Sequence, residues 1–171
     1  MRKLLFLFVF LLSTHFIWAQ SQPDGWTDGS GGEISSLNNL RWLSETPEAW
    51  DEDWVLTTNI SAGTTGNWND GKGFSPIGKQ GDSFTGTFDG QGYTISYLKI
   101  NRSEYQTDGS HKNIGLFGII HGNVKNLKLT NVDVKGGSSV GALAGKAYGT
   151  IDSCSVSGTV AAGGSVGGLV G

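Results

Sequence analysis

Hydrophobic and glycine positions recur along this chain with a long period. A short phrase begins at residue 114, at residue 140 and at residue 166, as IGLFG, VGALAG and VGGLVG, so its starts lie 26 residues apart. Self-similarity with a period of roughly 20 to 50 residues is typical of stacked repeat units, because one unit cannot bury its apolar face alone. The pattern therefore predicts a repeat protein.

The segments between the phrases repeat as well. Residues 122–129 (GNVKNLKL) match residues 149–156 (GTIDSCSV), 27 positions on, and residues 92–100 (GYTISYLKI) form an earlier copy, 29 positions before. The aligned apolar columns are Ile95/Val124/Ile151, Leu98/Leu127/Cys154 and Ile100/Leu129/Val156. The same alignment predicts that Lys125 lies directly under Asp152 on the outer surface.

The local pattern within each copy indicates strands joined by corners. The last two columns alternate with polar residues, as in a half-buried strand, and the three-residue step from Val124 to Leu127 predicts a corner at residues 125 and 126. Apolar tracts this short, separated by Gly and Asn, do not suit helices. We therefore predict an all-β fold, a right-handed parallel β-helix (β-solenoid) with about 26 residues per coil and neighbouring coils ~4.8 Å apart.

Residues 20–82 differ from the repeats, residues 83–171, because they hold five tryptophans and the repeats hold none. Apolar residues at 37, 40 and 43 predict a short helix within residues 33–43, with Ser35 or Ser36 as its N-cap, and residues 54–60 predict a strand. A solenoid exposes unpaired strand edges at its ends, so we predict that residues 20–82 form an N-terminal Trp-rich cap. The tryptophans are predicted to form the core of this cap, and stacking faces for sugars are the alternative.

The N-terminus predicts export. Residues 1–19 have the organisation of a signal peptide: Arg2 and Lys3, an apolar run at residues 4–12 that is too short to span a bilayer, and Ala19 at the cleavage site. The chain has 12 basic and 15 acidic residues, so loss of Arg2 and Lys3 leaves a net charge of −5. A mildly acidic protein lacks the excess of positive charge with which proteins bind nucleic acids or anionic membranes. We predict an exported protein, at the cell surface or extracellular, with no nucleic-acid partner and no membrane contact after signal cleavage.

Two further stretches identify a family resemblance. FTGTFDGQGYTI at residues 84–95, followed by IGLFG and VGGLVG, resembles the GLUG-motif repeat family, and WVLTTNI at residues 54–60 resembles the lead-in of such proteins. The resemblance implies a β-helical module of bacterial exported and surface proteins, which include adhesin-like proteins and immunoglobulin A-cleaving metallopeptidases. It implies no catalytic residues at the matching positions. This chain departs from the motif at Ala142 and Ala144.

Candidate catalytic and metal-binding residues are few. His111 and His121 do not form the H-E-x-x-H zinc motif and are predicted to be solvated loop residues, and no G-x-S-x-G motif is present. Asp89 precedes glycine and is predicted to form a turn rather than to act as an acid. The lone cysteine, Cys154, is predicted to be buried. We therefore predict no catalytic residues, no metal site and no cofactor.

One segment leaves a calcium site open. Residues 67–73 (NWNDGKG) place oxygen-bearing side chains at alternate positions, as the start of a Ca²⁺ loop does, but the distal Glu of an EF-hand is missing. The chain ends within its third phrase, and we expect the repeats to continue beyond Gly171.

The function predicted from these patterns is non-catalytic binding or display, resembling that of an adhesin. Residues 101–113 interrupt the period with charged and aromatic residues, and loops on rigid scaffolds are where recognition tends to occur. The predicted contact residues for a surface glycan or an extracellular protein are Arg102, Glu104, Tyr105, Asp108 and His111, with Lys112 beside them. Two alternatives remain: a polysaccharide-cleaving β-helix enzyme, and a passive spacer for a downstream domain.

Overall fold

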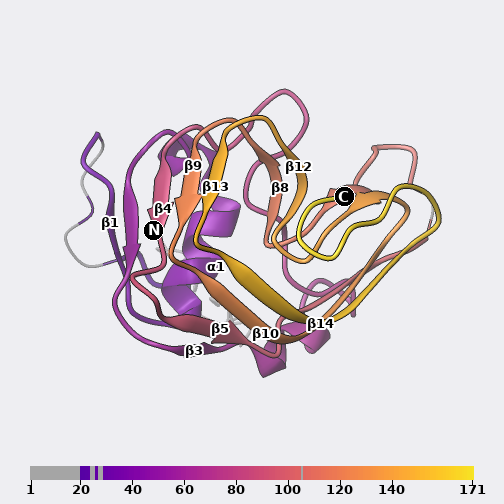
Figure 1. Ribbon diagram of the computed structural model, residues 1–171, viewed down its shortest axis with the longest axis horizontal. Helices are drawn as coiled ribbons and strands as arrows, with labels where there is room; N and C mark the ends of the chain where they lie inside the picture. Colours follow the sequence, from indigo (N-terminus) through magenta and orange to yellow (C-terminus); the bar gives the residue numbers. More distant parts are fainter. Residues whose placement is uncertain (1–19, 24–25, 27–28, 105) are drawn as a thin grey trace, which may run out of the picture.

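The chain winds through successive turns whose strands stack side by side (Figure 1). The computed structural model describes residues 20–23, 26, 29–104 and 106–171, so the predicted signal peptide lies outside the described residues. The strands are β1 (Gly32–Ile34), β2 (Trp54–Leu56), β3 (Ile60–Ser61), β4 (Thr87–Asp89), β5 (Thr94–Ser96), β6 (Lys99–Arg102), β7 (Lys112–Ile114), β8 (Phe117–Ile120), β9 (Asn123–Lys125), β10 (Lys128–Gly136), β11 (Ser138–Val140), β12 (Ala144–Ala147), β13 (Thr150–Asp152) and β14 (Ser155–Ala162). One α-helix, α1 (Leu37–Glu45), and two 3-10 helices, η1 (Pro47–Ala49) and η2 (Gly63–Asn67), complete the described elements.

The pairings between these strands are all parallel. One sheet has the order β1-β2-β4-β9-β13, and a second has the order β3-β5-β10-β14 with β6 also beside β10. Two smaller sheets pair β7 with β11 and β8 with β12. The prediction of an all-β fold built from parallel strands is confirmed.

The register of the last two repeats agrees with the sequence alignment. Ile151 pairs with Val124, and Val156 pairs with Leu129, in each case 27 positions apart. Lys125 pairs with Asp152 on the adjacent strand, and both residues are exposed, as predicted. The predicted corner is also confirmed, because Asn126 has a φ of 53°, in the left-handed region that turns a chain.

The alignment of the first copy is wrong. Ile95 pairs with Leu129 rather than with Val124, and Phe88 takes the place below Val124. The reason is a turn at Gln91 and Gly92, where φ is 51° and 80°. With this turn, Phe88 and Ile95 are seven positions apart, whereas their partners Val124 and Leu129 are five positions apart.

The turn at Gln91 also changes one predicted column of side chains. Leu127 is fully buried, as predicted, but it lies over Gly90 rather than over Leu98. A Cβ on Gly90 would come within 2.6 Å of the Leu127 Cα, so only glycine allows this approach. Leu98 is instead beside β10, where its carbonyl accepts a hydrogen bond from the Asp133 amide at 2.9 Å.

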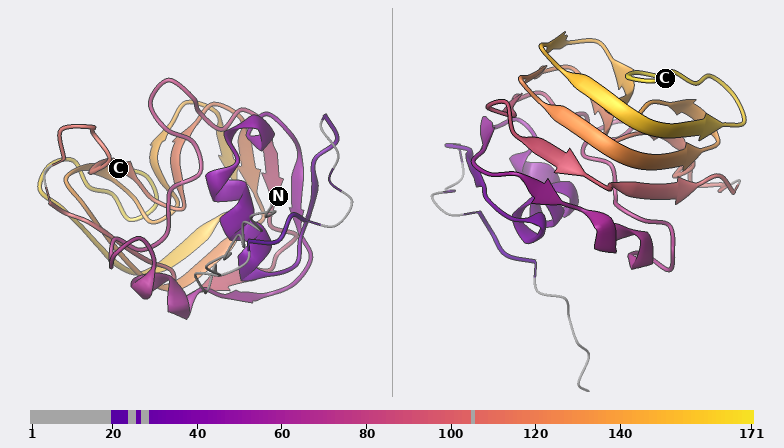
Figure 2. Two further views of the ribbon diagram at one scale, coloured as in Figure 1. Left: turned by 180° about the vertical axis from the view of Figure 1, so that it is seen from behind. Right: turned by 60° about the horizontal axis from the view of Figure 1, so that its bottom comes forward.

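The N-terminal part caps one end of the stack. Figure 2 shows α1 at the end opposite the last turn of the chain. The helix begins as predicted, with Ser36 as N-cap accepting a hydrogen bond from the Asn39 amide at 3.1 Å. Its apolar face buries Leu40 and Leu43 completely. The predicted strand at residues 54–60 is instead two short strands, β2 and β3.

The tryptophans form the core of this cap, as predicted. Trp50 and Trp54 are buried, and Trp26, Trp42 and Trp68 pack partly buried against the core. The Trp42 ring lies 4.9 Å from Trp26 and 6.0 Å from Trp54, measured between ring centroids. Large aromatic surfaces removed from water in this way stabilise the end of the stack. No helix in the described part of the chain is long and apolar enough to cross a membrane.

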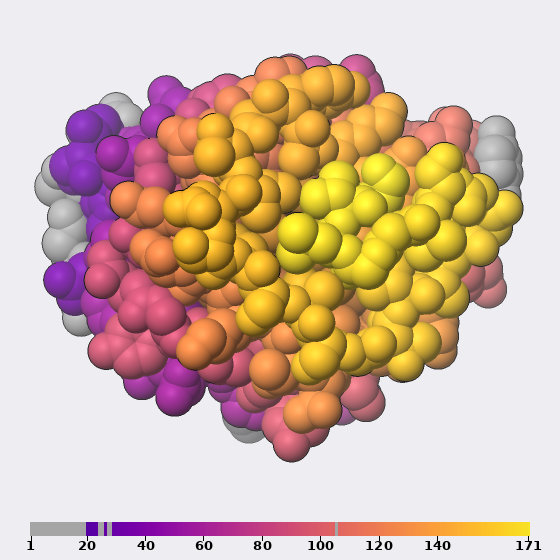
Figure 3. Space-filling view, viewed as in Figure 1, coloured from indigo at the N-terminus to yellow at the C-terminus, as the bar shows by residue number. Residues whose placement is uncertain are grey.

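Burial changes along the stack. The middle turn, residues 122–147, has fully buried inward side chains at Val124 and Leu127. The last turn, residues 149–171, forms part of the face seen in Figure 3, where its C-terminal end is yellow, and its inward residues are only half-buried or exposed. Cys154, predicted to be buried, is half-buried, because it lies in this last turn and no described segment covers it.

Candidate functional site

Two pockets share Arg102 at the end of β6. The Lys72 pocket has a volume of about 150 Å³, and its charged lining residues are Asp70, Lys72, Arg102 and Glu104. The Lys112 pocket has a volume of about 320 Å³, and its charged lining residues are Lys79, Arg102, Asp108 and Lys112. Ser110 also lines both pockets. We call the two together the Arg102 cleft.

Backbone pairing brings two distant loops together at this cleft. The Phe74 amide donates to the Lys99 carbonyl at 3.0 Å, and the Asn101 amide donates to the Lys72 carbonyl at 2.9 Å. Gly73 makes this contact possible, because a Cβ there would lie 2.3 Å from the Lys99 carbonyl oxygen and its φ is 83°. The segment at residues 68–80 is thus held against β6, opposite the loop at residues 103–111.

The Arg102 guanidinium lies partly buried between the two pockets. Its Nη2 donates to the Ser75 hydroxyl at 3.3 Å. Its Nε is buried and has no hydrogen-bond partner within the described structure. Burial lowers the pKa of Arg102, while the charge of Asp108 acts in the opposite direction. Arginine stays charged throughout the physiological range, so the cleft contains a permanent cation with unused donor capacity.

Asp108 is the carboxylate that interacts electrostatically with Arg102 and lines the Lys112 pocket with it. Hydrogen bonds from the Ser110 amide, at 2.9 Å to the Asp108 carboxylate, and from the Ser110 side chain lower the pKa of Asp108. The charge of Lys72 lowers this pKa further. Asp108 is therefore ionised at neutral pH, and it is exposed at the mouth of the Lys112 pocket.

The structure brings three of the five predicted contact residues together. Arg102 lines both pockets, Glu104 lines the Lys72 pocket and Asp108 lines the Lys112 pocket. Tyr105 lies outside the described residues. His111 is not at the surface, which corrects both its predicted solvation and its place in the binding site.

His111 has a structural position instead. It is only 6% exposed, and its Nδ1 accepts a hydrogen bond from the Gln106 amide at 3.2 Å. Its ring packs on the backbone between β10 and β11, since a Cβ on Gly137 would lie 2.4 Å from the His111 Cδ2. The hydrogen bond to Nδ1 holds Gln106 against the buried histidine, so His111 supports the described part of the loop that precedes it, residues 106–110.

The sequence interpretation missed the opposite wall of the cleft. Lys72, Ser75 and Lys79 come from the segment at residues 68–80, where the sequence indicated only a possible calcium site at residues 67–73. In that segment the Asn69 Nδ2 donates to the Gly73 carbonyl at 2.7 Å and closes the loop. Among the described residues, no group of three or more His, Cys, Asp or Glu side chains could hold a metal ion.

The second predicted histidine is exposed, as expected. The Nδ1 of His121 lies 2.8 Å from the Ser83 hydroxyl, and its ring stacks on Tyr148 with centroids 4.8 Å apart. Tyr148 is 66% exposed, so this cluster lies on the outer surface rather than in the Arg102 cleft.

Comparisons with known proteins give two sequence relatives. Halomucin from Haloquadratum walsbyi is 39% identical over 145 residues, which cover 81% of this chain and 2% of halomucin. A candidate Gly-rich membrane protein from Evansella cellulosilytica is 36% identical over 178 residues, which cover 91% of this chain and 19% of that protein. The chain thus spans a small part of the length of these relatives. No protein-family model matches the chain.

One solved structure resembles the fold. It is a candidate immunoglobulin A1 protease from Bacteroides ovatus, with a TM-score of 0.57 and 17% sequence identity. The match covers 76% of this chain and 38% of that chain. At this identity the likeness shows the fold alone, an arrangement of parallel strands that curls around a core.

Proposed function

We propose that this chain is a non-catalytic module of the cell surface or extracellular space, and that it binds a surface glycan or an extracellular protein in the Arg102 cleft. We also propose that its stacked turns form a right-handed parallel β-helix of the GLUG-repeat type. The parallel register between β9 and β13 supports this architecture. The names of the two relatives, halomucin and a Gly-rich membrane protein, support a surface location.

The observation that carries the proposal is the state of Arg102. A partly buried guanidinium whose buried Nε has no acceptor among the described residues costs stability, because a buried donor without an acceptor loses its hydrogen bond to water. Because this Nε is closed off from solvent, a ligand would recover that energy only if its binding opens the cleft enough to reach the donor. The scaffold beneath the cleft is rigid, since Ile100 and Ile114 are each only 1% exposed. Recognition on loops above such a core is a common arrangement.

A polysaccharide-cleaving enzyme remains the second candidate, and one observation favours it. Asp89, Lys125 and Asp152 form a ladder of charges across β4, β9 and β13 on the outer surface. However, Asp89 accepts hydrogen bonds from the Gln91 amide at 2.9 Å and from the Asn126 side chain at 3.0 Å. Lys125 lies 3.4 Å from the same carboxylate. These contacts fit the turn-forming role predicted from the sequence, and we propose that the ladder is structural.

Binding measurements on the exported protein test the proposal. We expect that the chain binds a surface glycan on an array or an extracellular protein on intact cells, and that Arg102→Gln weakens this binding. Lys128→Gln, which removes a charge from an exposed position on β10 that lines neither pocket, is the matched control and should leave binding unchanged. Binding that Arg102→Gln does not alter would contradict the site. Release of sugars from a polysaccharide by the purified chain would establish the enzyme instead.

A further inference from the structure

The two pockets of the Arg102 cleft differ in charge. In the Lys72 pocket, the cations Lys72 and Arg102 are balanced by the carboxylates of Asp70 and Glu104. In the Lys112 pocket, three cationic residues face the single carboxylate of Asp108. The Lys112 pocket therefore carries an excess of positive charge and is the part of the cleft suited to an anion.

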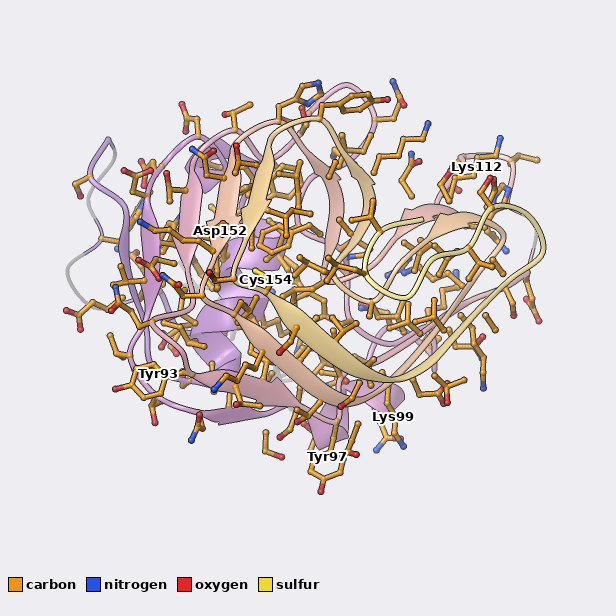
Figure 4. The ribbon with its side chains drawn as sticks, viewed as in Figure 1. Tyr93, Tyr97, Lys99, Lys112, Asp152 and Cys154 are labelled. Carbon is orange, nitrogen blue, oxygen red and sulfur yellow. The ribbon has the colours of Figure 1, made fainter. Side chains whose placement is uncertain are left out.

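Two of the three cationic residues, Arg102 and Lys112, are the candidates for binding such an anion. The third, Lys79, is directed partly toward the cap, because its ammonium lies 6.0 Å from the centroid of the Trp50 ring. Lys112 is exposed on β7, at the upper right in Figure 4. Arg102 lines the same pocket from the end of β6, and its buried Nε has no hydrogen-bond partner among the described residues. Two cationic residues from different elements, Arg102 on β6 and Lys112 on β7, thus line one cavity.

We propose that the Lys112 pocket binds the carboxylate or sulfate group of an acidic sugar residue, with Arg102 and Lys112 as its cationic partners. This inference rests on the proposed binding function of the Arg102 cleft. The planar guanidinium matches the two oxygens of a carboxylate, and charge-assisted hydrogen bonds of this kind are stronger than neutral ones. Of the eight other lining residues, four carry a hydroxyl or a side-chain amide that suits the hydroxyl groups of a sugar: Ser75, Gln80, Ser110 and Asn113.

The dimensions and lining favour a sugar over an acidic peptide. A cavity of about 320 Å³ is small for a ligand site and fits one compact group rather than a chain segment. Protein partners are typically anchored by aromatic or large apolar side chains in apolar pockets. The apolar lining residues here are Pro76 and Ile114, and Ile114 is buried in the core.

Asp108 opposes the bound anion. It is ionised at the mouth of the pocket and interacts electrostatically with Arg102, so it competes with the ligand for that cation. Its oxygen also accepts from the Ser110 amide, a role that asparagine can retain. Replacement of this carboxylate by an amide should therefore strengthen binding without loss of the turn. A purely structural ion pair would give the opposite result.

The test compares a carboxylate with its ester in the same sugar. The full chain is titrated with trigalacturonate and with fully methyl-esterified trigalacturonate. A third ligand, a trisaccharide of uncharged sugars that carries a sulfate ester and no carboxylate, shows whether sulfate is bound in place of carboxylate. We expect the esterified form to bind at least about tenfold more weakly than trigalacturonate, since the neutral ester cannot form a charge-assisted hydrogen bond with the guanidinium. Binding of the charged sugars should also weaken with rising salt.

Substitutions assign the effect to the pocket. Arg102→Gln and Lys112→Gln should each weaken trigalacturonate binding by about tenfold or less, and Asp108→Asn should strengthen it by a few fold. Lys112 is exposed, so its variant should fold even where Arg102→Gln does not. Lys128→Gln removes the same charge from an exposed position on β10 and should bind as the unmodified chain does.

Three results would overturn the inference. Equal binding of the acid and the ester would show that charge is not recognised, while the proposed binding function would stand. A hexaglutamate peptide that competes as strongly as trigalacturonate would show that the pocket takes an acidic peptide rather than a sugar. If these acidic sugars and every glycan and extracellular protein tested fail to bind, the proposed function fails as well.

Discussion

The middle turn and the last turn of this chain have the same pattern but different surroundings. Val124 in the middle turn is fully buried, whereas Ile151, its partner in register, is half-buried. Val140 is likewise fully buried, whereas Val166, directly paired with it, is 53% exposed. The residues differ little in size or polarity. The difference therefore comes from the position of each turn in the stack.

This comparison separates register from burial. Hydrogen bonds along the strands fix which residues pair, and β14 pairs with β10 along nearly its whole length, with one register shift between Leu129 and Val132. Burial requires a neighbour on both sides, and β14 has only β10 among the described strands. In stacked repeats, stability is approximately a sum of unit and nearest-neighbour terms. The same substitution should therefore cost more in the middle turn than in the last turn.

The largest expected difference lies in the column of Leu127 and Cys154. Leu127→Ala should lower the free energy of unfolding by about 2–5 kcal/mol, because it opens a cavity in a closely packed core. Leu127→Asp should prevent cooperative folding, since the charge would have no partner there. Cys154→Ala, at the aligned position in the last turn, removes a smaller side chain from a half-buried site and should cost about 1 kcal/mol or less. Urea unfolding followed by circular dichroism measures all three, and equal costs for the two alanine variants would contradict the comparison.

A smaller difference is expected between two glycines. A Cβ on Gly122 would lie 1.9 Å from the Gly86 carbonyl oxygen, so Gly122→Ala must displace backbone and should cost about 1–3 kcal/mol. A Cβ on Gly168, in the last turn, would meet nothing within 4 Å. Gly168→Ala should leave stability unchanged or raise it by up to about 1 kcal/mol. Thermal unfolding of the two variants tests this, and a Gly122→Ala protein as stable as the unmodified chain would show that these turns are not closely stacked there.

The smallest effect concerns the charge ladder and depends on pH. Burial by itself raises the pKa of Asp89, but the Gln91 amide, the Asn126 side chain and the Lys125 ammonium together lower it below the ordinary value of 3.8. A carboxyl with a lowered pKa stabilises the fold above that ordinary value, and this contribution is lost as the pH falls through the lower, folded value. Asp89→Asn should therefore reduce stability at pH 7 by less than about 1 kcal/mol and flatten its decline at acidic pH.

A variant in the last turn controls for this effect. Asp152→Asn removes a carboxylate that pairs in register with Lys125 but takes part in none of the ion pairs within 4 Å between described residues. It should change the free energy of unfolding at pH 7 by less than Asp89→Asn does. A larger loss of stability from Asp152→Asn would contradict this account, because it would mean that Lys125 interacts more strongly with Asp152 than with Asp89. Denaturant titrations between pH 2.5 and pH 7 measure the free energy of unfolding of both variants.

Much of the fold could be predicted because the last two repeats have equal lengths. Equal length lets the pairing of Val124 with Ile151 be found by alignment alone. The first copy failed because two residues, Gln91 and Gly92, lengthen its corner, and the apolar pattern contains no sign of which residues form the extra turn. The exposure of Cys154 was missed for another reason: sequence columns show which residues point inward but not how many turns cover them.

The candidate site could be predicted only in part. The loop with Arg102 and Asp108 was found because it interrupts the repeat period. The opposite wall, with Lys72 and Ser75, comes from nearly 30 residues earlier, and the pairing of Gly73 with Ile100 that brings it there leaves no periodic signal. The burial of His111 also depends on the backbone at Gly137, which a local pattern does not indicate.

Amide hydrogen exchange measures the central comparison most directly. Local opening is easier where few buried contacts hold a strand, so exchange should reveal the free energy of each turn separately. We expect the amides of β9 and β10 in the middle turn to be protected much longer than those of β13 and the part of β14 that follows Gly158. Mass spectrometry of peptides from residues 122–136 and 149–162 in the unmodified chain provides the measurement. Equal protection of the two segments would contradict the account, because it would show that coverage by a neighbouring turn does not set local stability.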